Sequence, residues 1–192
     1  MTETLPEAVR QAAAAGTTPI EVWFQDEARV GQQGTLTRVW AARGSRPPAP
    51  RDQRYKWAYI FGAVCAERGT GAGLVLPYAN ADAMTLHLAE ISRQVAPGAH
   101  AVVVLDGAGW HRQGGRLRVP DNISLLHLPR YSPELNPQEN VWALLRANKL
   151  GNRVCATYNA VVDACCDAWT WLMQQPERIT TIATRPWATV TT

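Results

Sequence analysis

The sequence of 192 residues is poor in charge and lacks any long apolar run. Charged residues make up 18% of it, below the roughly 25% of an average globular protein, whereas 46% are hydrophobic. No stretch approaches the ~18 consecutive apolar residues of a membrane-spanning helix. The acids Glu3 and Glu7 lie where a signal peptide would be basic. These features argue against a disordered chain and favour a soluble cytoplasmic protein with no membrane partner.

Cysteine and lysine are also scarce. The four cysteines form no C-x-x-C pair, and the adjacent Cys165 and Cys166 are poorly placed for a zinc site, so we expect reduced thiols. Only Lys56 and Lys149 among the 19 basic residues are lysines, which leaves 17 arginines. The planar fork of arginine suits phosphate oxygens. The base composition of the genome would explain this bias equally well.

The basic residues are unevenly distributed, although the net charge is only +3. One segment holds seven of them and a single acid, Asp52: Arg29, Arg38, Arg43, Arg46, Arg51, Arg54 and Lys56. A net charge this small does not indicate a nucleic-acid partner by itself. The clustering is harder to attribute to base composition and favours a surface that contacts phosphate groups.

The hydrophobic pattern predicts one main domain with a mixed sheet. Strands are predicted over 20–25, 35–40, 57–64, 73–77, 101–105 and 123–128, and helices over 81–95, 136–150 and 157–173. Gly69, Gly71 and Gly73 predict a turn, and an Ala-rich helix within residues 1–19 forms an N-terminal extension. The order predicts an α/β fold with a ribonuclease H-like mixed five-stranded sheet, antiparallel at its start and parallel at its end, flanked by helices.

Two carboxylates follow predicted strands. Asp26 closes the first predicted strand, and Asp106 closes the continuously apolar strand over 101–105. Ligands of open α/β sheets gather at the carboxyl ends of the strands, so this placement favours a functional role. The small residues Gly107 and Gly109 leave room beside Asp106. Each Asp is also explained as an ordinary turn-forming residue.

A third carboxylate, Glu139, lies at the start of the helix predicted over 136–150. Asn136 suits an N-cap, Pro137 suits the first helical position and Glu139 falls at N3, so the segment spells a capping box. Two prolines, Pro129 and Pro133, stiffen the approach to this helix, which capping does not explain. The residue pattern alone leaves both interpretations of Glu139 open.

Three segments together resemble a known family. FQDEARVG, VVLDGAGWHR and LPRYSPELNPQENVWALLR, in that order, resemble the catalytic blocks of DDE-type transposases, in the bacterial insertion-sequence branch related to the mariner superfamily. The resemblance covers about residues 20–171 and identifies Asp26, Asp106 and Glu139 as the catalytic, metal-binding triad, with the last two 33 positions apart. It implies that residues 20–192 form the catalytic domain and that the family's N-terminal helix-turn-helix region has no counterpart here.

The resemblance also implies a chemistry. Three converging carboxylates repel one another unless divalent cations neutralise them, and Mg²⁺ prefers such oxygen ligands. We expect Mg²⁺ or Mn²⁺, as two ions, to support cleavage of DNA and attack of the freed 3′-hydroxyl on target DNA. His111 and Glu27 are candidates for contacting the scissile phosphate or orienting a group at the metal. A partly buried structural role is an equally good explanation of His111.

The expected partner is double-stranded DNA, both element ends and target. Phosphate contacts are expected from Arg29, Arg43, Arg46, Arg51, Arg54, Lys56, Arg112, Arg116 and Arg130. A homodimer in a synaptic complex, a separate DNA-binding subunit and association with the bacterial nucleoid also agree with the resemblance. Two alternatives remain, a ribonuclease H-like nuclease without strand transfer and a non-catalytic DNA-binding remnant.

Overall fold

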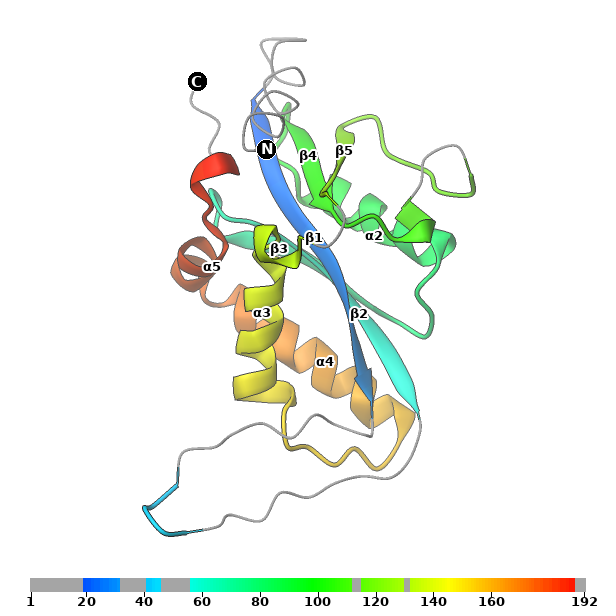
Figure 1. Ribbon diagram of the computed structural model, residues 1–192. Coiled ribbons are helices and arrows are strands. Elements are labelled where there is room, and N and C mark those ends of the chain that lie inside the picture. The colour runs from blue at the N-terminus through cyan, green and yellow to red at the C-terminus, as the bar shows by residue number, and fades with distance from the viewer. Residues whose placement is uncertain (1–18, 32–40, 46–55, 112–114, 130–131, 189–192) are drawn as a thin grey trace.

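The computed structural model describes residues 19–31, 41–45, 56–111, 115–129 and 132–188, and its centre is a five-stranded sheet (Figure 1). The strands are β1 (Ile20–Gly31), β2 (Trp57–Cys65), β3 (Thr70–Leu76), β4 (His100–Leu105) and β5 (Ile123–His127), in the spatial order β3-β2-β1-β4-β5. The first three strands pair antiparallel, and β1–β4 and β4–β5 pair parallel. The predicted mixed sheet is therefore confirmed. The predicted strand over 35–40 and the predicted N-terminal helix lie outside the described residues.

Helices cover both faces of this sheet. The helix α2 (Ala81–Gln94) packs on one face, over β2 and β3. On the other face lie α3 (Gln138–Leu145), α4 (Tyr158–Met173) and α5 (Pro176–Ala183). Each face has its own hydrophobic core. The described residues include no helix that is both long and apolar enough to cross a membrane.

Strand β4 shows why its sequence is apolar throughout. Val102 and Val104 belong to the core under α3 and α4, whereas Val103 and Leu105 belong to the core under α2. All four are buried, because a central strand between two helical layers exposes neither face. The prediction of a central strand covered on both sides is confirmed.

The first strand is twice as long as predicted, which changes the position of Asp26. Instead of ending at residue 25, β1 continues to Gly31, because β2 pairs with it antiparallel from Trp23 to Gly31. The prediction that Asp26 closes the strand is therefore wrong. Asp26 lies within β1, just beyond the part that pairs with β4, whose last partner in β1 is Phe24.

The glycines before β3 also have a different role from the predicted one. Only Gly69, with φ of 59°, is in the turn, and Gly71 and Gly73 are already within β3. A Cβ at Gly73 would lie 2.6 Å from atoms of the Trp169 ring on α4. Gly73 therefore allows α4 to approach the sheet closely, and this need for space could not be distinguished from a turn by composition.

Two helical segments differ from prediction. The helix expected over 136–150 is α-helical only from Gln138 to Leu145 and continues as a π-helical turn over Arg146–Leu150. The helix α5 was not predicted. It has eight residues, with Pro176 in its first turn and Ile179 and Ala183 buried, and so short a segment carries a weak periodic signal.

Candidate active site at the ends of β1 and β4

Asp26 and Asp106 both follow the point where the parallel pairing of β1 and β4 ends. The last aligned pair is Phe24 with Val104; Asp26 lies two residues further along β1, and Asp106 follows Leu105, the last residue of β4. Side chains two residues apart in a strand point to the same face, so Asp26 lies on the face of Phe24, which packs under α3 and α4, whereas the Asp106 carboxylate is directed at His111. The register thus brings together two residues that are 80 positions apart in sequence.

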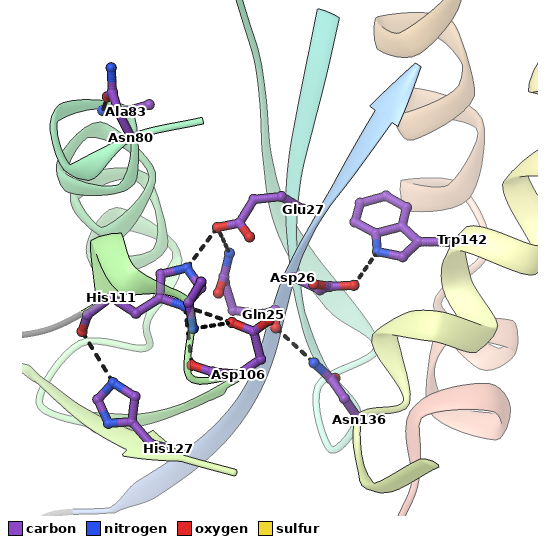
Figure 2. A network of polar contacts seen from close by, with 11 residues as sticks. Gln25, Asp26, Glu27, Asn80, Ala83, Asp106, His111, His127, Asn136 and Trp142 are labelled. Atoms are coloured by element: carbon purple, nitrogen blue, oxygen red, sulfur yellow. Dashed lines mark hydrogen bonds and ion pairs between the residues drawn. The ribbon is translucent and has the colours of Figure 1, made fainter. Parts of the chain in front are cut away.

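Asp26 is half-buried and is held by a tryptophan. The indole Nε1 of Trp142 donates to Asp26 Oδ2 over 2.8 Å (Figure 2). The pKa of Asp26 is raised from 3.8 to about 7, mainly by burial and to a smaller extent by the carboxylates of Glu27 and Glu139, whereas the Trp142 hydrogen bond opposes the rise. The site therefore places a carboxylate where its negative charge is unfavourable unless a cation is present.

Asp106 and Glu27 are linked by His111. His111 Nδ1 lies 2.8 Å from Asp106 Oδ1, and His111 Nε2 lies 2.9 Å from Glu27 Oε1 (Figure 2). The His111 side chain is only 1% exposed. Burial disfavours its charged form, but the two carboxylates outweigh burial and raise the pKa of His111 to about 9. The same hydrogen bond from His111 holds the pKa of Asp106 below its usual value.

The backbone after β4 fixes this arrangement. The amide of Ala108 donates to Asp106 Oδ1 over 3.0 Å, and Gly109–His111 form a short 3-10 turn that carries the imidazole back toward β1. A Cβ on Gly107 or Gly109 would meet no described atom within 4 Å. The predicted open space beside Asp106 is therefore present, and Asp106 itself is exposed.

Glu139 lies in the first turn of α3 and is exposed. Glu139 Oε2 is 3.8 Å from Arg146 Nη2. The negative charge of Glu139 also contributes to the raised pKa of Asp26. The capping box does not form as a reciprocal pair. Pro137 occupies the N-cap, while the Asn136 side chain accepts from the amide of Gln138 and donates to the carbonyl of Gln25. Asn136 therefore ties the start of α3 to β1.

The three predicted metal ligands approach one another without forming a closed metal site. Within the described ranges, no three side chains of Asp, Glu, His or Cys are arranged so that they would hold a metal ion. The Asp106 carboxylate is directed at His111, and that of Glu139 is near Arg146. Asp26 and Asp106 follow the same end of the parallel β1–β4 pairing, and the charge of Glu139 contributes to the raised pKa of Asp26.

The predicted DNA-contacting residues are only partly described. Arg29, Arg43, Lys56 and Arg116 are exposed, and the Arg29 guanidinium lies 4.2 Å from the centre of the Trp57 ring. The other predicted contacts lie outside the described residues: Arg46, Arg51, Arg54, Arg112 and Arg130. The four exposed cations are accessible to a phosphate backbone.

Two contacts in this site were not predicted. The Trp142 bond to Asp26 and the Asn136 bond to Gln25 both join α3 to β1. A sequence signal for the first exists, because Trp142 follows Glu139 by three residues, which puts both on one side of a helix. Nothing in the spacing of Asn136 and Gln25 indicated the second.

This sheet order, with an aspartate within β1 and another directly after β4 and with helices on both faces, defines a ribonuclease H-like domain. The model of the DDE superfamily endonuclease family matches residues 21–161, and the chain belongs to that family. A relative from Sinorhizobium fredii (strain NBRC 101917 / NGR234), "Uncharacterized protein y4pE/y4sA", is 58% identical over 132 residues, which is 69% of this chain and 97% of that protein.

Solved structures of the Mos1 transposase share the fold. The Mos1 strand transfer complex aligns with a TM-score of 0.57 and 14% identity, over 96% of this chain and 61% of that one. The Mos1 mariner paired-end complex with Mn gives a TM-score of 0.57 and 14% identity over 96% and 62%. The Mos1 catalytic domain with Raltegravir and Mg gives 0.54 and 14% over 96% and 94%. The chain thus spans about three fifths of the two Mos1 chains in the DNA complexes and nearly all of the catalytic domain.

Proposed function

We propose that residues 20–192 form a transposase catalytic domain that performs metal-dependent DNA cleavage and 3′-hydroxyl strand transfer during transposition of an insertion sequence. Family membership supports an endonuclease, and the similarity to Mos1 supports a transposase. The observation that supports the proposal is the register that brings Asp26 and Asp106 to the same end of the parallel β1–β4 pairing, with the charge of Glu139 acting on Asp26. Neighbouring carboxylates disfavour one another's charged forms unless a cation is bound.

We assign Asp26, Asp106 and Glu139 as the ligands of Mg²⁺ or Mn²⁺, bound as two ions. The donor set fits this assignment, because carboxylate oxygens are the ligands that these cations prefer. The raised pKa of Asp26 also fits, since burial and two neighbouring carboxylates disfavour its negative charge, which a bound cation would stabilise. When bound, the ions supply Lewis-acid stabilisation of charge at the phosphate and activation of the attacking oxygen.

We assign His111 and Glu27 to orienting Asp106 rather than to contacting the scissile phosphate. Both ring nitrogens of His111 already face carboxylates, and the ring is buried. An imidazole held in this way fixes the rotamer of Asp106, as residues around metal ligands commonly do. Glu27 in turn fixes the ring of His111.

The proposed substrates are the double-stranded DNA of the element ends and of the target. Mos1 has been captured with transposon ends in paired-end and strand-transfer complexes, which supports a synaptic homodimer here as well. Arg29, Arg43, Lys56 and Arg116 are the exposed residues that we assign to the phosphate backbone. Recognition of the end sequences is assigned to a separate DNA-binding subunit.

A plasmid nicking assay with Mg²⁺ or Mn²⁺ tests the proposal. Wild-type protein is expected to nick supercoiled DNA, and Asp106→Asn is expected to abolish nicking without loss of folding. Asp121→Asn is the matched control, because Asp121 is an exposed aspartate just before β5. Nicking by Asp106→Asn at the wild-type rate would contradict the site assignment.

Strand transfer is tested with a precut oligonucleotide that carries a 3′-hydroxyl and a supercoiled target. We expect joined product, and none when the same end carries a 3′-deoxy nucleotide. Nicking without joining would identify the protein as a ribonuclease H-like nuclease. The open arrangement of the carboxylates in the described residues is what a non-catalytic remnant would also show. Absence of divalent-metal binding in calorimetry would identify it as such a remnant.

A further inference from the structure

Trp142 connects the helix that carries Glu139 to the strand that carries Asp26. Its side chain is 2% exposed, and its indole N–H donates to Asp26 Oδ2 over 2.8 Å (Figure 2). A hydrogen bond from a buried neutral donor to a carboxylate is charge-assisted and therefore stronger than an ordinary one. Because Glu139 and Trp142 are one turn apart on α3, a constraint on Trp142 is also a constraint on Glu139.

The sheet beneath Trp142 is shaped to hold the ring in place. Gly62 of β2 pairs with Asp26 in the antiparallel register. A Cβ on Gly62 would lie 2.6 Å from Cη2 of Trp142, so only a glycine there lets the ring reach the sheet. On its other side, the Trp169 ring lies 6.2 Å from that of Trp142 at an angle of 45°. The indole therefore has little freedom to turn away from Asp26.

A second contact fixes the start of the same helix. Asn136 is 5% exposed, and its amide donates to the carbonyl of Gln25, the residue before Asp26, over 2.9 Å. Glu139 thus lies between two points at which the helical segment is tied to β1, one before it and one after it. The two hydrogen bonds, from Asn136 and from Trp142, reach the adjacent residues Gln25 and Asp26 of β1.

We propose that Trp142 is a positioning residue for the metal-binding carboxylates, holding Asp26 by one oxygen and setting the separation of Asp26 from Glu139. The indole engages Oδ2, and the backbone of Glu27 provides a second hydrogen bond to the same carboxylate. This inference rests on the proposed metal site. It adds that the geometry of that site depends on a neutral side chain that touches neither the metal nor DNA.

The protein contains a matched control for this hydrogen bond. Trp23 Nε1 donates to Glu21 Oε2 over 2.9 Å, on the same strand and with the same chemistry. Glu21 is also held by Arg68 and by the amide of Ala96, near the opposite end of β1. A cation at the proposed site should affect the Trp142 indole and leave the Trp23 indole unchanged.

The experiment is a Mg²⁺ titration of ¹⁵N-labelled protein, followed through the indole N–H signals. The two signals are assigned by their disappearance in Trp142→Phe and Trp23→Phe. We expect the Trp142 signal to shift saturably, with the dissociation constant found by calorimetry, and the Trp23 signal to stay in place. A Trp142 signal that does not move while the site fills would overturn the inference.

The second experiment measures the affinity for Mn²⁺ by calorimetry. Trp142→Phe, which keeps an aromatic ring but loses the N–H, is expected to weaken binding about 10- to 100-fold, the usual loss on removing a partner of a metal ligand. Trp23→Phe makes the same change in the other core, where the indole donates to Glu21, and should bind Mn²⁺ like the wild type. Equal affinity in folded Trp142→Phe and wild type would overturn the inference. If Trp142→Phe fails to fold, the Trp142 signal is assigned by eliminating the indole signals that disappear in Phe variants of the other tryptophans, and the Mg²⁺ titration of the wild type decides alone.

Failure of the proposed function gives a different pattern. Wild-type protein that binds no divalent cation would overturn both proposals before any tryptophan variant is made. Wild-type protein that binds the cation and nicks DNA, while Trp142→Phe does the same with equal affinity, would overturn only the positioning role.

Discussion

The imidazole of His111 lies between Glu27 of β1 and Asp106 at the end of β4, 2.9 Å from one carboxylate and 2.8 Å from the other. The Glu27 side chain is 8% exposed, so its charge depends on this partner. His111→Gln therefore leaves a buried carboxylate without a cation. We expect the free energy of unfolding to fall by roughly 3–5 kcal/mol in denaturant titrations.

A double-mutant cycle checks that Glu27 is the cause of this loss. Glu27→Gln in the His111→Gln protein should restore part of the stability, with a coupling energy of about 0.5–3 kcal/mol. Strictly additive losses would show that the two side chains do not interact in solution.

Asp26→Asn is expected to stabilise the protein in metal-free buffer at pH 7 while abolishing nicking. Burial and, to a smaller extent, two neighbouring carboxylates raise the pKa of Asp26 to about 7, whereas the amide of Asn carries no charge and can still accept from Trp142. At about 1.4 kcal/mol per unit of raised pKa, the gain is on the order of 1–4 kcal/mol. Thermal unfolding in the presence of a chelator measures it, and a lower melting temperature for the variant would contradict the assignment.

His87 on α2 is expected to make the fold sensitive to acid. It is 0% exposed beside Phe61, and burial lowers its pKa from 6.5 to about 3, with a smaller effect from His111, the titratable neighbour that acts on it. Between these values the unfolded chain binds a proton that the folded chain does not. The free energy of unfolding should therefore fall by about 1.4 kcal/mol per pH unit below pH 6.5.

Replacement of His87 isolates this effect from the other titrating groups. His87→Leu should flatten the decline in stability between pH 6.5 and pH 4, because the unfolded chain loses the corresponding proton site. Denaturant titrations at several pH values measure the two slopes. Identical slopes in the variant and the wild type would contradict the origin that we assign.

Alanine substitutions at two glycines distinguish crowding of the hydrophobic core from disturbance of the proposed metal site. Gly62→Ala and Gly73→Ala both force a Cβ to within about 2.6 Å of ring atoms, so each should destabilise the protein by about 1–3 kcal/mol. The atoms nearest to a Cβ on Gly62 belong to Gln138, Trp142 and Trp169, whereas those nearest to a Cβ on Gly73 all belong to Trp169. Gly62→Ala should therefore also weaken Mn²⁺ binding, and Gly73→Ala should not. Equal Mn²⁺ affinity in both variants would show that the Trp142 ring adjusts without cost.

The exposed cations should contribute to DNA binding through counterion release. Lys56→Gln and Arg116→Gln are each expected to weaken binding equally for all DNA sequences and to reduce the slope of log K against log salt by about 1. Fluorescence anisotropy over a range of salt concentrations measures this slope. Lys149→Gln serves as the control for loss of one positive charge. The Lys149 ammonium lies 5.0 Å from the centre of the Trp171 ring on α4 and is not among the residues that we assign to DNA. An unchanged slope for Arg116→Gln would remove it from the DNA path.

The sequence by itself determined the class of fold and the family. A continuously apolar segment such as that of β4 is stable between two helical layers, and blocks such as the one ending at Trp142 are specific enough to indicate a DDE transposase. It also identified Asp26, Asp106 and Glu139 as candidate ligands. It misjudged the length of β1, because pairing with β2 depends on a partner more than 25 residues away.

Only the tertiary structure decided how those carboxylates are held. The Trp142 bond to Asp26, the Asn136 bond to Gln25 and the place of His111 between Glu27 and Asp106 all join segments that are distant in sequence. Their geometry follows from strand register and from the close approach of α3 and α4 to the glycines of β2 and β3. A local pattern supplies the residue types, but the distances between them are set by packing, because burial fixes a side chain only when its neighbours are in place.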